Sequence, residues 1–216
     1  MSSTAPFPGS PPSLLSDLIE LVRRPERVYP RLFARGRAAS VLAFSAVSGI
    51  YVAYAIAGWL DLGDAIGFWP TVLLILPAGT LLGFLALYFA GGLLSWSAEA
   101  LRGREETTER MYAVFGYATW PFLPLLLIIV PIEFALYGTF LFSEVQPPAP
   151  AAAVWAVRLL EVATIGLWLY LMIKGTAAAA RESDVEAAET VALTLVEIAV
   201  IGILFFLILL VSLLYW

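Results

Sequence analysis

The 216-residue chain contains no cysteine and no histidine. The missing cysteine excludes disulfides, thiol nucleophiles and thiolate metal sites, and the missing histidine removes the commonest general base and the commonest metal ligand. Charged residues are also scarce at 13%, and the formal net charge of −5 differs from the basic balance of nucleic-acid-binding proteins. We therefore expect no cofactor, no metal and no nucleic-acid partner.

Hydrophobic residues, in contrast, make up 61% of the chain, and its mean hydropathy is +0.90. They lie in long blocks, each with the roughly 20 apolar residues that a bilayer core requires. The sequence predicts an all-α, polytopic membrane protein with five transmembrane helices preceded by a short amphipathic interfacial helix. The predicted membrane domain is 38–216, with spans at approximately 38–60, 69–98, 111–142, 152–173 and 190–216.

Two segments precede the first predicted span. Residues 1–12 are rich in proline, serine and glycine, which predicts a flexible tail. Residues 13–37 form an amphipathic and basic segment in which the apolar side chains of Ser13–Arg24 recur at helical spacing, with Asp17 and Glu20 on the opposite, polar side. This helix is too short to span a bilayer. It either packs at the membrane interface or docks a partner.

Basic residues alternate between the predicted loops. The N-terminal segment has six arginines, the 101–110 loop has three and the 174–189 loop has one lysine and one arginine, whereas the other loops have none. By the positive-inside rule, this alternation predicts a cytoplasmic N-terminus and an external C-terminus. Arginine and alanine enrichment favours a bacterial protein, and hence the inner membrane. The same arginines either fix orientation or form a cytoplasmic partner surface, for which the candidates are Arg23, Arg24, Arg27, Arg31, Arg102, Arg104 and Arg110.

The predicted span at 111–142 is interrupted by Pro121, Pro124 and Pro131. A membrane helix tolerates such prolines because neighbouring helices satisfy the backbone groups that proline leaves unpaired. Small residues at four-residue spacing in the first two spans predict faces for close helix contact. The candidates are Gly49, Ala53, Ala57, Gly79 and Gly83.

Four charged residues lie inside predicted spans: Glu133, Arg158, Glu161 and Glu197. Arg158 and Glu161 share a helix face, and Glu133 lies at a similar depth, so a cluster in which Arg158 partners Glu133 is expected. Glu197 lies at a different depth and has no evident partner. Charges in a membrane are costly. These residues either hold helices together or form a proton or ion relay.

Motifs of known enzyme classes are missing from the chain. It has no HExxH, no GxSxG, no P-loop and no GxGxxG before a strand, which indicates a non-enzymatic protein. Five spans do not divide into two equal halves, and no internal repeat of the kind common in transporters is visible.

The order of features nevertheless resembles the Yip domain family, multi-span proteins first known as interactors of Ypt/Rab-type GTPases. The resemblance rests on RPERVYPRL before the first span, FAGGLLSWSAEALRG at the end of the second, YAVFGYATWP in the third and WLYLMIKGTAAA at the end of the fourth. It implies a five-span helical bundle with a cytoplasmic N-terminus and a packing centre at Gly116 and Tyr117. The chain has no DLYGP-like element of the eukaryotic members, so the resemblance extends to the fold and not to a GTPase partner.

The family's eukaryotic members are associated with vesicle trafficking, membrane shaping and GTPase recruitment. The sequence thus favours a membrane-organising or partner-recruiting scaffold that contacts the lipid bilayer and either a second copy of itself or another membrane protein. The alternative is a transporter or channel subunit that uses the four intramembrane charges.

Overall fold

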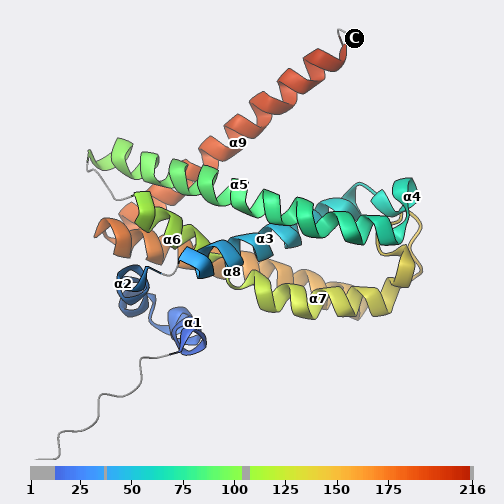
Figure 1. The fold of residues 1–216 in the computed structure, drawn as a ribbon, viewed down its shortest axis with the longest axis horizontal. Coiled ribbons are helices and arrows are strands. Elements are labelled where there is room, and N and C mark those ends of the chain that lie inside the picture. Colours follow the sequence, from blue (N-terminus) through green and yellow to red (C-terminus); the bar gives the residue numbers. More distant parts are fainter. Residues whose placement is uncertain (1–12, 37, 104–107, 215–216) are drawn as a thin grey trace, which may run out of the picture.

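The structure of the chain, a computed structural model, describes residues 13–36, 38–103 and 108–214. Within these ranges the chain forms nine α-helices, one short 3-10 helix and no strand (Figure 1). Five helical segments are long and apolar enough to cross a membrane. The predicted all-α, five-span architecture is therefore confirmed, while the predicted tail at 1–12 lies outside the described residues.

The N-terminal part forms two helices where the sequence predicted one. Helix α1 is Leu14–Arg23, and the side chain of Ser13 caps it by accepting a hydrogen bond from the backbone N–H of Ser16 at 3.2 Å. Helix α2 is Pro25–Arg35; proline is well suited to a first helical position, and Gly36 ends the helix with a positive φ of 54°. We call residues 13–36 the collar, since they lie against one end of the membrane helices (Figure 1).

The membrane helices are mostly longer than predicted. The second, α5, would be about 50 Å long at 1.5 Å per residue, which exceeds the roughly 30 Å hydrocarbon core. Short α4 connects the first two spans at the end of the bundle opposite the collar (Figure 1). The bounds are α3 (Ala38–Trp59), α4 (Leu62–Ile66), α5 (Phe68–Arg102), α8 (Ala151–Ala180) and α9 (Asp184–Leu214).

The proline-rich third span is divided into two helices, α6 (Thr108–Ala118) and α7 (Phe122–Tyr137), followed by the 3-10 helix η1 (Gly138–Phe140). The break lies at Pro121, which has no N–H to donate to the α6 ladder. A tight turn replaces that ladder, and the N–H of Phe122 donates to the Thr119 carbonyl at 3.1 Å. Pro131 is accommodated inside α7.

The predicted packing glycines lie where α3 crosses α5. A Cβ added to Gly49 would lie 2.2 Å from the Gly79 carbonyl oxygen, and one added to Gly83 would lie 2.0 Å from that of Ser45. Ala57 is buried and Ala53 is half-buried on the same helix. These small residues allow the two backbones to touch, so this face is occupied within the chain.

A second close contact joins α3 to α6. A Cβ at Gly116 would lie 2.5 Å from Val41 Cγ1, and the ring of Tyr117 packs against Phe44 with centroids 6.2 Å apart. Both Gly116 and Tyr117 are buried. Tyr117 belongs to the largest apolar core of the described residues, which joins the collar to α3, α5, α6, α8 and α9.

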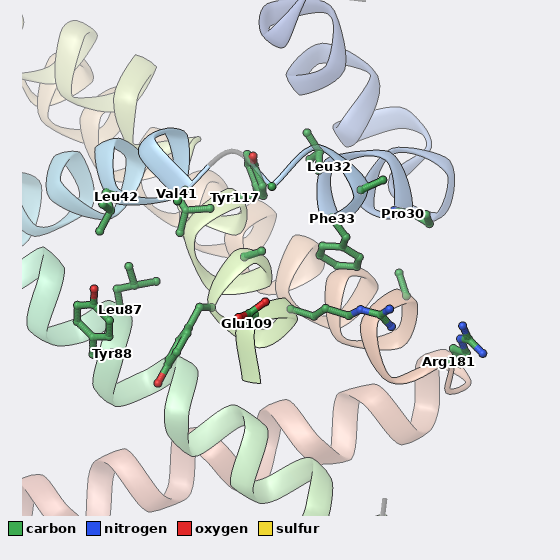
Figure 2. A pocket seen from close by; sticks show the side chains of 17 residues that line it. Pro30, Leu32, Phe33, Val41, Leu42, Leu87, Tyr88, Glu109, Tyr117 and Arg181 are labelled. Carbon is green, nitrogen blue, oxygen red and sulfur yellow. The ribbon is translucent and has the colours of Figure 1, made fainter. Parts of the chain in front are cut away.

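A groove of about 970 Å³ opens beside this core, between the collar and the membrane helices (Figure 2). Its lining comes from α2, α3, α5, α6 and the end of α8. The collar therefore covers part of the bundle end and leaves an opening beside it.

Candidate functional site

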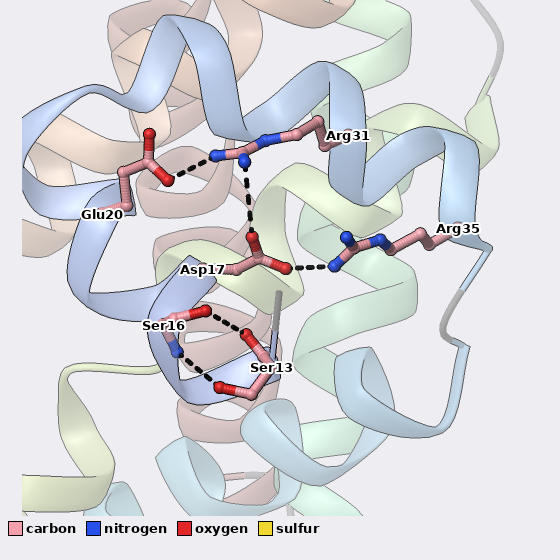
Figure 3. Close-up of polar contacts among 6 residues, drawn as sticks. All are labelled: Ser13, Ser16, Asp17, Glu20, Arg31 and Arg35. Carbon is pink, nitrogen blue, oxygen red and sulfur yellow. Dashed lines mark hydrogen bonds and ion pairs between the residues drawn. The ribbon is translucent and has the colours of Figure 1, made fainter. Parts of the chain in front are cut away.

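The collar is held together by a buried carboxylate (Figure 3). Asp17 of α1 is 0% exposed, and its Oδ1 lies 3.9 Å from Arg31 Nη1 while its Oδ2 accepts a hydrogen bond from Arg35. Arg31 also donates to Glu20 at 2.6 Å. The polar side on which the sequence places Asp17 faces α2, and two guanidinium groups of that helix compensate the cost of burying its charge.

Neighbouring charges and burial shift the pKa values of three collar side chains, Glu20, Arg31 and Tyr29. Donation from Arg31 lowers the pKa of the Glu20 carboxyl below its ordinary value, and Glu20 in turn raises the pKa of Arg31. Burial raises the pKa of the Tyr29 hydroxyl, because the phenolate would lose its hydration. The ion pair therefore stays charged at neutral pH, and Tyr29 remains a neutral hydrogen-bond donor.

Tyr29 anchors the collar to the membrane helices. Its hydroxyl donates a 3.0 Å hydrogen bond to the Leu171 carbonyl of α8, and its ring lies where a Cβ on Gly175 would come within 2.7 Å. Val28 and Leu32 of α2 are buried in the same core. Helix α2 is therefore an integral part of the fold.

Three of the candidate arginines form a free surface on this anchored support. Arg23, Arg24 and Arg27 are exposed and make no ion pair with any other described residue. A shallow hollow beside them includes the exposed apolar side chain of Ile19. Arg31, in contrast, is committed to Asp17 and Glu20. We call Ile19, Arg23, Arg24 and Arg27 the collar surface.

The remaining candidate arginines do not extend the collar surface. Arg102, at the end of α5, pairs with Glu189 at 2.8 Å and lies 3.5 Å from Glu182, so it ties α5 to the start of α9. Arg110, on α6, lines the groove. Arg104 lies outside the described residues.

Three of the four predicted intramembrane charges meet between α3, α7 and α8. The hydroxyl of Tyr54 donates to Glu133, that of Tyr51 donates to Glu161 at 2.8 Å, and Arg158 donates to Glu161 at 2.7 Å. Glu133 and Arg158 form no direct ion pair. Arg158 binds Glu161, and the donor to Glu133 is Tyr54, which shares a face of α3 with Tyr51. The expected pairing of Glu133 with Arg158 was wrong.

Glu197 stands apart from this group, between α9 and α5. The hydroxyl of Ser97 donates to its carboxylate at 2.9 Å, and Thr194 donates to Ser97 at 3.0 Å. The sequence left Glu197 without a partner, because its donor Ser97 lies on α5, across a helix contact that sequence spacing does not show. Within the described residues, no hydrogen bond or ion pair connects Glu197 to the other three charges.

Several residues of these contacts were not singled out from the sequence. Tyr29 and Gly175 lie in two of the segments that carried the resemblance, RPERVYPRL and WLYLMIKGTAAA. The sequence therefore marked both segments but did not show that the two residues pack against each other. Tyr51 and Tyr54 could have been found as hydroxyl groups at i, i+3 spacing in an apolar helix. No group of three or more histidine, cysteine, aspartate or glutamate side chains that could hold a metal occurs in the part of the chain that the structure describes.

Comparison with known proteins gives one match. The family model of the Yip1 domain matches residues 19–210, nearly the whole chain and including the second half of α1 and all of α2. No curated protein and no solved structure matches the chain.

Proposed function

This chain belongs to the Yip1 domain family, and from that premise we propose that it is a non-enzymatic multi-pass membrane protein that recruits partners at the cytoplasmic face. The observation that carries the proposal is the basic collar surface, whose two helices are held in place by buried side chains. Arg23, Arg24 and Arg27 are exposed and unpaired among the described residues, while Asp17 and Tyr29 lock the helices that bear them.

The chemistry of the collar surface indicates the kind of partner. Arginine favours carboxylates because its planar guanidinium donates two parallel hydrogen bonds, and the exposed Ile19 offers an apolar contact beside the charges. A support that is already ordered loses little conformational entropy on binding. We propose a membrane-associated protein with an acidic and apolar segment as the partner, rather than a GTPase inferred from the family alone.

The orientation belongs to the same proposal. The alternation of arginines supports a cytoplasmic collar in a bacterial inner membrane, with the C-terminus outside. Because the chain has no native cysteine, single cysteines report orientation cleanly. Ser183→Cys, between α8 and α9, should be protected from a membrane-impermeant maleimide in intact cells, while Val145→Cys, between α7 and α8, should react. The reverse pattern would contradict a cytoplasmic collar.

Recruitment is best tested by substitutions on the collar surface. Deleting residues 13–37 would remove Val28, Tyr29 and Leu32 from the core and would confuse misfolding with loss of binding. We propose the triple charge reversal Arg23→Glu, Arg24→Glu and Arg27→Glu, compared with the triple lysine variant, which keeps the charge. Proteins crosslinked in native membranes and purified with each variant are then quantified.

We expect the glutamate variant to lose acidic partners at least tenfold at unchanged thermal stability, because three attractive contacts become repulsive. The lysine variant should retain them in part, since it keeps the charge and loses the bidentate geometry. An identical partner set for the wild type and the glutamate variant would overturn the recruitment proposal.

The transporter alternative has less support in the structure. The intramembrane charges fall into two groups, one between α3, α7 and α8 and one between α5 and α9. Each group is satisfied by hydroxyl donors or by Arg158. This arrangement is typical of polar residues that hold membrane helices together.

A further inference from the structure

The groove between the collar and the membrane helices changes from apolar to charged along its length. Figure 2 shows Leu42, Leu87 and Tyr88 at one end and Arg181 at the other, with Glu109 between them. Leu42 lies on α3, and Arg181 directly follows the last residue of α8. A phospholipid has the same order of chemistry, with acyl chains at one end and a charged headgroup at the other.

The charged end of the groove carries more cations than anions. Its lining includes Arg110, Arg181 and Glu109. Within the described ranges, neither arginine makes an ion pair, in contrast to Arg31, Arg102 and Arg158. Two guanidinium groups that have no ion-pair partner among the described residues lie beside the apolar part of the groove. They can attract a phosphodiester by opposite charge and donate paired hydrogen bonds to its oxygens.

Arg181 also has an unusual backbone. It adopts a left-handed conformation with φ 55° directly after α8, a position where glycine is the usual residue. Residues other than glycine, asparagine and aspartate are disfavoured in this left-handed conformation. An arginine at this position therefore acts against local backbone preference, and its guanidinium is placed at the end of the groove.

The size and place of the groove fit a lipid. Its volume of about 970 Å³ is at the upper end of the range of roughly 300–1,000 Å³ for small-molecule sites. Its charged end lies near the start of α6 and the end of α8, where membrane helices reach the headgroup layer. Basic pockets between membrane helices at this depth suit anionic headgroups.

We propose that the groove binds one anionic phospholipid of the phosphatidylglycerol type. Its phosphate lies between Arg110 and Arg181, a headgroup hydroxyl donates to Glu109, and one acyl chain follows Leu42, Leu87 and Tyr88. The lipid would fill the space between α2 and the membrane helices. The proposal does not depend on recruitment at the collar surface, because it uses none of the collar-surface residues.

The test is native mass spectrometry of the full-length protein in detergent micelles with added phosphatidylglycerol or phosphatidylcholine. We expect the wild type to retain one phosphatidylglycerol molecule in preference to phosphatidylcholine. Arg110→Gln and Arg181→Gln should each weaken retention about fivefold, the effect typical of one basic residue near an anionic lipid surface. Arg24→Gln, an exposed arginine outside the groove, is the matched control and should change nothing.

Two further variants separate binding from folding. Arg181→Gly removes the cation and relieves the left-handed backbone, so it should preserve or raise thermal stability while phosphatidylglycerol retention falls about fivefold. Ala34→Trp adds bulk at an exposed residue that lines the groove and should exclude the acyl chain. Retention of phosphatidylglycerol by both variants at the wild-type level would overturn the proposal.

Other occupants give distinct results, and each would overturn the proposal. Equal retention of phosphatidylcholine would show that the headgroup charge is not recognised. Displacement of phosphatidylglycerol by millimolar inorganic phosphate would show a free anion site. A dimer in the wild type that holds no lipid and dissociates in Ala34→Trp would assign the groove to a second copy of the chain.

Discussion

The hydroxyl of Tyr29 donates to the carbonyl of Leu171, joining two residues 142 positions apart through a buried hydrogen bond of 3.0 Å. The contact requires Gly175, one helical turn after Leu171, because any Cβ there would meet the tyrosine ring. A segment preceding the first span is thereby built into the end of the fourth. The collar is part of the membrane fold, which makes its exposed arginines a positioned surface.

Gly175→Ala should destabilise the protein by about 1–3 kcal/mol, because its Cβ would lie 2.7 Å from both Tyr29 Cζ and Val114 Cγ1. Gly166→Ala on the same helix meets nothing within 4 Å and is the matched control. It should be neutral or slightly stabilising, since alanine favours helix more than glycine does. Thermal unfolding in detergent measures both variants. Equal stability of the two would contradict the close packing of α2 on α8.

Gly83→Ala should separate α3 from α5, because its Cβ would lie 2.0 Å from the Ser45 carbonyl oxygen. We expect a loss of at least about 2 kcal/mol, since backbone atoms cannot move aside as a flexible side chain can. In Gly92→Ala the nearest atom is the Tyr112 hydroxyl at 3.8 Å, so that variant should fold normally. Chemical crosslinking between cysteines on α3 and α5 checks the separation, and an unchanged yield in Gly83→Ala would contradict it.

Asp17→Asn should loosen the collar, because Arg31 and Arg35 would lose the buried charge between them. Both arginine side chains are partly exposed, so the expected loss is about 1–2 kcal/mol, below the value for a fully buried pair. Trypsin cleavage after the exposed Arg23 and Arg27 should accelerate, whereas the Arg24–Pro25 bond resists trypsin. Glu26→Gln alters an exposed carboxylate of the same collar and serves as the control. Equal cleavage rates for the wild type and Asp17→Asn would show that the buried pair does not hold the collar.

The hydrogen bonds of Asp64 form a contact at the end of the bundle opposite the collar, and we expect this contact to be sensitive to acid. Its carboxylate accepts hydrogen bonds from the Ser143 hydroxyl and from the Glu144 backbone N–H, the latter at 2.9 Å, and these bonds lower the pKa of the Asp64 carboxyl below its ordinary value. A carboxyl with a depressed pKa contributes stability above its unfolded-state pKa and loses it as the pH falls through the folded-state value. The wild type should therefore lose stability relative to Asp64→Asn as the pH falls below about 4, the ordinary pKa of an aspartate. Parallel pH profiles for the two proteins would contradict this role.

Glu133→Gln separates a structural role from transport. The amide oxygen can still accept from Tyr54, so we expect a modest loss of stability, within about 1 kcal/mol. In liposomes, the wild type and the variant should show the same proton leak as empty vesicles. Tyr54→Phe, which leaves the carboxylate without its donor, should destabilise more. Proton flux in the wild type that is lost in Glu133→Gln would restore the transporter hypothesis.

The candidate site was only partly predictable. The sequence identified Arg23, Arg24 and Arg27 as candidates, but it grouped them with Arg31, which the structure commits to Asp17 and Glu20. A positive charge is visible in the sequence, whereas its partner is not, because the partner comes from a second helix whose orientation is set by packing. The groove could not be predicted from the sequence for the same reason, because residues from five helices line it.

The sequence by itself determined the five spans and the all-α class, because span formation depends on the apolarity of about 20 consecutive residues, a local property. It also determined the small-residue faces, since four-residue spacing in a helix is local too. Only the tertiary structure decided that Asp17 is buried, that Tyr54 rather than Arg158 binds Glu133, and that Ser97 binds Glu197. These pairings depend on how helices rotate and cross, which the apolar cores decide. Apolarity along the chain thus set the number of spans, and packing between distant segments set the contacts of each charge.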